Sequence, residues 1–221
     1  MVAVILGCSS LAGHVEAAQA KMQTNYPFIA LERKYHVNPK QMRVEILQAL
    51  QQLPAEVDTV LVAMGFCGGS WQNVAARQRL VLPCVVDCIT LLLHTDGERH
   101  FNLKQKNHFY LRDTDEGEYS LEGIYQGLCQ KNGSAKGAEI FNSWFAPFTD
   151  ADIIDTGVYD CYAGDYLAAA RRNADLAKCR LNHVVGSNLL LEKLVSGQWD
   201  KQFVVVEPAA YAVTADLFKD E

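Results

Sequence analysis

The chain has 221 residues, of which 49% are hydrophobic and 21% are charged, a composition typical of a folded globular protein. It excludes collagen, coiled coils and intrinsic disorder. The 20 basic and 26 acidic side chains give a net charge of −6, so no overall positive field draws the protein to nucleic acid or to an anionic membrane. A chain of this length buries an adequate core without a structural metal. Any metal that it binds is therefore expected to be functional.

The cysteines and the longest apolar run predict the compartment. The seven cysteines are an odd number, and their spacing does not follow a secreted disulfide framework, which predicts reduced thiols. The longest apolar run, Leu80–Leu93, contains Pro83 and Asp87 and is shorter than the roughly 20 residues of a membrane span. We expect a soluble, cytoplasmic protein.

Short apolar runs alternate with helical patterns in the first part of the chain. Strands are predicted at Val2–Leu6, Phe28–Leu31, Val57–Met64 and Leu80–Leu82. Helices are predicted at Leu11–Met22, from Pro39 to Leu53, and at Cys88–Leu93. Asp87 is placed to cap the last of these helices. Unbroken apolar runs of this length are typical of buried parallel strands.

A similar alternation returns after a polar middle segment. The segment from Thr95 to Tyr119 contains one predicted strand, Phe109–Leu111, and is followed by two amphipathic helices, Leu121–Gln130 and Ala138–Phe148. Further strands are predicted at Ala151–Asp155, Leu181–Val185 and Phe203–Val206, with helices at Tyr166–Ala177 and Leu189–Leu194. The second alternation repeats the architecture of the first.

The strand and helix alternation predicts an α/β fold with Rossmann-like parallel sheets in a pseudo-symmetric, two-lobe arrangement. We divide the chain into an N-terminal lobe (1–95), a connecting and variable segment (96–150) and a C-terminal lobe (151–221). Ligands of such sheets bind beyond the carboxyl ends of the strands. The residues that directly follow strands are therefore the candidate functional residues.

One residue that can bind a metal follows each of the first four predicted strands. These residues are Cys8, His36, Cys67 and Cys88. Because a parallel sheet brings its strand ends to one edge, we expect the four side chains to lie together. Three thiols and an imidazole suit zinc, and thiolates also bind iron–sulfur clusters. The alternative is that each cysteine is a small core hydrophobe, since the chain has no Cys-x-x-Cys pair.

The same residues are candidates for catalysis. Cys67 lies between Phe66 and two glycines, where the backbone can expose a thiol. Cys88 lies at a predicted helix start, where the dipole favours a thiolate. His36 precedes Asn38-Pro39 and could act as an acid or base, or could cap the turn. Backbone amides that could bind an anionic cofactor are expected at Gly65, Gly68 and Gly69.

Three residues in the second half are candidates for cofactor binding. Tyr159 follows a predicted strand and, beside Asp160, could hold a substrate ammonium or a planar ligand, or could lie in a surface turn. Gly186 and Ser187 follow the next strand and could form an anion-binding helix start. The chain lacks the dinucleotide fingerprint and the Walker pattern, so NAD and ATP are not predicted.

Several of these motifs together resemble a known family. They are Cys8, His36-Val37-Asn38-Pro39, Gly65-Phe66-Cys67-Gly68, Asp87-Cys88-Ile89, Gly186-Ser187 and Gly197-Gln198-Trp199-Asp200. In order and separation they resemble the uncharacterised family called domain of unknown function 1638, over nearly the full chain. Met64 and Val86 depart from it, since the family often has tyrosine and histidine there. The resemblance implies a connection with corrinoid-dependent methyltransferase systems and one-carbon or methylamine metabolism.

Three functional hypotheses follow. The first is a metal-binding protein, holding zinc or an iron–sulfur cluster, that serves corrinoid or one-carbon methyl transfer as an enzyme or a cofactor-handling accessory. The second is a metal-free, racemase-like or amidohydrolase-like enzyme in which Cys67 faces Cys161. The third is a binding module without chemistry that contacts a methyltransferase component through residues 95–119. The expected partners are a small-molecule ligand or that component.

Overall fold

The computed structural model describes residues 2–113, 117–208 and 212–218 of the chain. These residues form two compact units, one from residues 1–103 and 187–221 and the other from residues 104–186. The units differ from the predicted segments 1–95, 96–150 and 151–221 because the chain returns to the first unit after Gly186. The polar segment 95–119 runs from one unit into the other, and its residues 114–116 lie outside the described residues.

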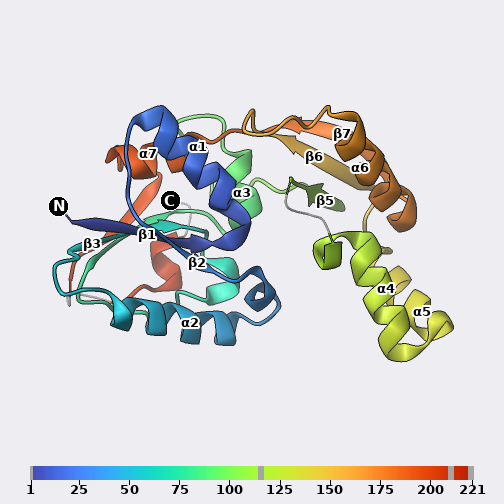
Figure 1. The fold of residues 1–221 in the computed structure, drawn as a ribbon, viewed down its shortest axis with the longest axis horizontal. Coiled ribbons are helices and arrows are strands. Elements are labelled where there is room, and N and C mark those ends of the chain that lie inside the picture. The colour runs from blue at the N-terminus through green and yellow to red at the C-terminus, as the bar shows by residue number, and fades with distance from the viewer. Residues whose placement is uncertain (1, 114–116, 209–211, 219–221) are drawn as a thin grey trace. The chain divides into compact units, whose positions relative to one another are not determined.

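The first unit contains a five-stranded sheet in the order β2-β1-β3-β4-β8 (Figure 1). Its strands are β1 (Ala3–Cys8), β2 (Phe28–Leu31), β3 (Thr59–Ala63), β4 (Arg79–Pro83) and β8 (Phe203–Val206). The first four are parallel, as their apolar runs predict, and β8 lies antiparallel to β4. Phe203–Val206 continues the predicted alternation along the chain, but it pairs in the first sheet and not with the strands of residues 151–185. Its Phe-Val-Val-Val sequence favours a strand but does not specify which strand it pairs with.

Helices cover both faces of this sheet. The helices of the first unit are α1 (Ala12–Met22), α2 (Pro39–Gln52), α3 (Cys88–Leu93) and α7 (Leu189–Ser196). Figure 1 shows α1 and α7 together on one face and α2 on the other. Their apolar sides, with Val15 and Ile46 among them, bury β1 and β3 completely. A side chain at Gly7 would place its Cβ 2.6 Å from Ala63 O, so only glycine lets these two strands pair.

The second unit has a parallel sheet in the order β5-β6-β7. Its elements are β5 (His108–Leu111), α4 (Leu121–Asn132), α5 (Ser134–Phe145), β6 (Asp150–Asp155), α6 (Gly164–Ala177) and β7 (Arg180–Val185). Phe141 is buried at its centre and stacks on Phe145 with ring centroids 4.6 Å apart. The alternation of strands and helices confirms the predicted α/β class with parallel sheets. No helix in the described part of the chain is long and apolar enough to cross a membrane.

Candidate metal centre

The four predicted metal ligands all lie at the carboxyl edge of the parallel strands. Cys8 ends β1, and His36 lies in the short 3-10 helix η2 (Arg33–Val37) after β2. Cys67 begins the short 3-10 helix η3 (Cys67–Gly69) after β3, and Cys88 begins α3 after β4. The strand order reverses between β1 and β3. A crevice opens at such a reversal because the connections on either side leave toward opposite faces of the sheet.

Three of these side chains form a close group. One donor atom from each of Cys8, His36 and Cys88 lies within 4.8 Å of the other two. Cys8 Sγ is 3.1 Å from His36 Nε2 and 3.0 Å from Ser10 Oγ. The two thiols are buried and the histidine is exposed. This group of two thiols and an imidazole could hold a metal ion.

Cys67 contacts Cys88 but is not one of the three residues of the close group. Its Sγ lies 3.9 Å from that of Cys88, yet it is not within 4.8 Å of all three donor atoms. The residue as a whole is half-buried. The backbone of Cys67 has a φ of +47°, in the left-handed region that residues other than glycine rarely adopt. Backbone strain of this kind is concentrated at functional sites.

Two of the predicted cofactor-binding glycines allow loops to approach each other closely. A Cβ at Gly65 would lie 2.6 Å from the Cα of Asp87, and a Cβ at Gly68 would lie 2.8 Å from Pro39 Cγ. Gly69 accepts a hydrogen bond of 2.7 Å from the Arg43 guanidinium through its carbonyl. The Cys67 loop is therefore pressed against the starts of both α2 and α3. A role for these glycines in binding a cofactor stays a prediction.

Helix caps and backbone hydrogen bonds fix the segment that carries Cys88. Asp87 Oδ1 accepts a 2.9 Å hydrogen bond from Thr90 N, which confirms the predicted cap of α3. The N–H groups of Phe66 and Cys67 donate to the carbonyls of Val85 and Val86, at 2.9 and 2.8 Å. The two loops that carry Cys67 and Cys88 therefore run side by side.

The pKa values of the three thiols are shifted in different directions. A hydrogen bond from Cys88, opposed by burial and helped by His36, lowers the pKa of Cys8 to about 3. A hydrogen bond from Cys88 also lowers the pKa of Cys67. The same hydrogen bonds to Cys67 and Cys8, together with burial, raise the pKa of Cys88. The raised pKa of Cys88 is opposite in direction to the predicted effect of the helix dipole, because its two thiol neighbours and burial favour the protonated form. A bound metal ion would displace that proton.

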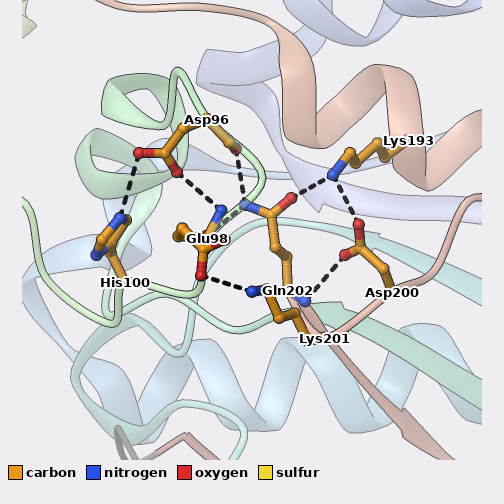
Figure 2. Close-up of polar contacts among 7 residues, drawn as sticks. All are labelled: Asp96, Glu98, His100, Lys193, Asp200, Lys201 and Gln202. Atoms are coloured by element: carbon orange, nitrogen blue, oxygen red, sulfur yellow. Dashed lines mark hydrogen bonds and ion pairs between the residues drawn. The ribbon is translucent and has the colours of Figure 1, made fainter.

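A polar network anchors the loop that supports this region (Figure 2). The buried Gln202 donates from its amide to the carbonyls of Asp96 and Glu98, at 3.1 and 2.6 Å, and accepts from Lys193 Nζ at 2.5 Å. The same loop contains Phe101, whose carbonyl accepts a hydrogen bond of 2.8 Å from the N–H of Val86. The network therefore connects α7 and the turn before β8 to the loop of residues 96–101, which is hydrogen-bonded to the segment that carries Cys88.

The remaining predicted residues lie outside this cluster. Tyr159 packs on Tyr166 in the core of the second unit, and its hydroxyl donates to Ile154 O at 2.7 Å. Gly186 N donates to Asp155 O at 2.9 Å. Ser187 N donates to Leu92 O at 2.8 Å, and Ser187 Oγ accepts from Leu189 N at 3.1 Å at the start of α7. These contacts are structural, and ligand binding by the three residues stays a prediction.

Sequence reasoning missed two polar features. Ser10, whose hydroxyl contacts Cys8, could have been found from the Gly-Cys-Ser-Ser sequence after a strand. In the second unit His108 Nδ1 lies 2.6 Å from Asp152 Oδ2, and Asn182 Nδ2 donates to both Asp150 and Asp152. The signal was the period-two spacing of Asp150 and Asp152 within a buried strand.

The family model described as "Protein of unknown function (DUF1638)" matches residues 30–195. This stretch contains His36, Cys67 and Cys88 and begins after Cys8. No curated protein and no solved structure matches the chain. Because the family model covers more than half of its residues, the chain belongs to the DUF1638 family, whose function is unknown.

Proposed function

We propose that the first unit binds one soft divalent metal ion through Cys8, His36, Cys88 and Cys67, and that this ion is zinc. The observation that carries the proposal is the convergence of donor atoms from Cys8, His36 and Cys88 within 4.8 Å, although the three residues come from separate elements. Two buried thiols beside an imidazole are a donor set that zinc prefers over the hard cations magnesium and calcium.

Of two separations that involve sulfur, the sulfur–sulfur separation is close to that of a single tetrahedral ion, and the sulfur–nitrogen separation is shorter. Bonds of about 2.3 Å to sulfur and 2.0–2.1 Å to nitrogen separate tetrahedral ligands by about 3.8 Å for two sulfurs and about 3.6 Å for sulfur and nitrogen. Cys67 and Cys88 Sγ are 3.9 Å apart, and Cys8 Sγ and His36 Nε2 are 3.1 Å apart. The ring of His36, which is exposed, has room to move outward by the difference.

An iron–sulfur cluster fits this donor set less well than zinc. Its ligands bind different irons and so stand farther apart than ligands of one ion, and clusters are commonly held by four cysteine thiolates. The donor atoms of Cys8, His36 and Cys88 are crowded within 4.8 Å. The cluster is kept as the alternative that the experiment below distinguishes.

The proposed biological context rests on the family resemblance. We propose that the metal centre serves corrinoid-dependent or one-carbon methyl transfer, as an enzyme or as an accessory that handles a cofactor, with a small molecule or a methyltransferase component as partner. An ion held by three protein ligands and one exchangeable position can act as a Lewis acid on a thiol or water. The arrangement of Cys8, Cys88 and His36, with Cys67 set apart, is compatible with such a centre.

The test is elemental analysis and an absorption spectrum of anaerobically purified protein. We expect about one zinc per chain and no visible band, and we expect Cys8→Ser and Cys88→Ser to abolish binding. Cys84→Ala is the matched control, because Cys84 is also buried in the first unit but lies outside the group. Strong visible absorption with bound iron would favour the cluster. Metal-free protein that cannot be reconstituted would refute the proposal.

One observation favours thiol catalysis without metal as a second candidate. Cys67 combines a strained backbone, partial burial and a lowered pKa, which together are typical of a nucleophile. Its proposed partner Cys161 belongs to the second unit, and burial raises the pKa of that thiol. The pairing of the two cysteines stays a prediction. Alkylation of metal-free protein by iodoacetamide tests the candidate, which requires Cys67 to react faster than Cys84.

A further inference from the structure

The three thiols of the site are carried by different kinds of backbone structure. Cys8 is the last residue of β1 and pairs with Leu31 in the neighbouring strand. Cys88 is the first residue of α3, whose start is fixed by the Asp87 cap. Both thiols are therefore anchored in regular structure, one at a strand end and the other at a capped helix start.

Cys67 is attached differently. It begins three successive residues in the left-handed region, with φ values of +47°, +65° and +86° for Cys67, Gly68 and Gly69. Glycine adopts other conformations at little cost, so we expect any movement of the segment to occur at Gly68 and Gly69, and it would have to break the hydrogen bond from Arg43 to the Gly69 carbonyl. Cys67 gains from such a movement, because its own left-handed backbone is unfavourable. The hydrogen bond from its N–H to Val86 O limits the motion to the side chain and the following residues.

Of the four candidate ligands, Cys67 and His36 are the residues that have surface exposed to solvent. Cys67 is half-buried and His36 is exposed, whereas Cys8 and Cys88 are buried. Val37, next to His36, is 91% exposed, which places an apolar surface beside the entrance. We therefore expect a molecule from solution to approach the centre on the side of Cys67 and His36.

From these contrasts we infer that Cys67 is the exchangeable ligand of the centre, and that a small thiol from solution takes its position. The inference rests on the proposed metal site and adds which ligand leaves and what replaces it. In the exchange the bond between the metal and Cys67 sulfur breaks, a bond to the incoming sulfur forms, and the proton of the incoming thiol passes to Cys67. No electrons are transferred. A thiol is favoured over a carboxylate because two thiolates and an imidazole select a soft metal, which prefers sulfur.

The test uses the full chain loaded with Co²⁺, whose charge-transfer absorption reports thiolate ligands. We expect Cys67→Ser to keep one metal per chain and to lose about a third of this absorption, because two of three thiolates remain. Added 2-mercaptoethanol should restore the absorption, and acetate should not. Cys84→Ala should behave as the unaltered protein.

Other outcomes would overturn the inference. They are loss of metal from Cys67→Ser to the same extent as from Cys88→Ser, an unchanged spectrum, or restoration by acetate. A second measurement does not depend on a variant: in the metal-loaded, unaltered chain, iodoacetamide should modify Cys67 at least tenfold faster than Cys8 or Cys88 without releasing the metal. Equal protection of the three cysteines would also overturn it. Failure of the unaltered chain to bind any metal would instead refute the proposed function.

Discussion

Replacing Gly65 by alanine tests whether the contact between the two loops holds the metal site together. A Cβ at this position would lie 2.6, 2.7 and 2.8 Å from the Cα, N and C atoms of Asp87. These are backbone atoms, so no side-chain rotation relieves the clash. Gly65 is not among the described glycines with positive φ, so alanine suits its backbone conformation and the expected effect is steric.

We expect Gly65→Ala to destabilise the first unit by about 2 kcal/mol, within the range of about 1–3 kcal/mol for overpacked sites. With a urea m-value of about 2 kcal/mol/M, the midpoint of unfolding should fall by about 1 M. The two loops must separate, which stretches the Cys67 N to Val86 O hydrogen bond of 2.8 Å and moves Cys67 from Cys88. Affinity for Zn²⁺ should fall by roughly tenfold or more, as it does when the support of metal ligands is disturbed.

The assay is urea denaturation followed by tryptophan fluorescence in a Trp144→Phe background, so that Trp71 and Trp199 in the first unit give the signal. Gly13→Ala is the matched control, because a Cβ there meets nothing within 4 Å and Gly13 lies in α1. It should be neutral or more stable by up to about 1 kcal/mol. If Gly65→Ala unfolds at the midpoint of the control and binds Zn²⁺ equally well, the steric reasoning is wrong.

Three further changes have defined outcomes. Asp87→Ala removes the α3 cap and should cost about 1 kcal/mol in urea denaturation, together with affinity for Zn²⁺, whereas Asp87→Asn should retain most of both. Hydrogen bonds from Thr149 and Asn182 lower the pKa of Asp150 to about 2. Its unfolded pKa is about 3.9, so the stability that it contributes is complete above that pH and is lost as the pH falls toward 2; Asp150→Asn should flatten this dependence in acid titrations followed by circular dichroism. Phe141→Ala should destabilise the second unit by about 3–5 kcal/mol, measured by Trp144 fluorescence, while Zn²⁺ stoichiometry stays unchanged, because all four candidate ligands lie in the first unit.

The local structure of this chain is largely predictable because its strands and helices have strong periodic signals. The buried strand near the N-terminus and the amphipathic helix from Pro39 follow from apolar spacing and helix-start residues alone. What the pattern could not supply is long-range pairing. Phe203–Val206 lies beside β4, in the first sheet, because α7 returns the chain to that unit, and no local signal specifies that return.

The candidate site was predictable to the level of residue identity but not of geometry. The convergence of Cys8, His36 and Cys88 follows from one rule, that parallel strands present their carboxyl ends at one edge. The separate position of Cys67 does not follow from it, because it depends on a backbone φ of +47° set by tertiary contacts. The direction of the pKa shift of Cys88 was equally hidden, since it depends on hydrogen bonds to Cys67 and Cys8 that only the folded chain brings together.

The position of the donors in the chain makes the proposed metal binding a property of the folded first unit alone. Residues 8, 36 and 88 are separated by long stretches of sequence, so the unfolded chain cannot present them together, and the free energy of binding adds to the free energy of unfolding. The thiols differ in what they contribute to this coupling. Cys8 and Cys88 are held by a strand and a capped helix. We therefore expect them to lose little further conformational entropy when they bind the proposed ion. Cys67 stands on a strained turn that is followed by two glycines, so we expect it to be the ligand that leaves while the others retain the proposed ion.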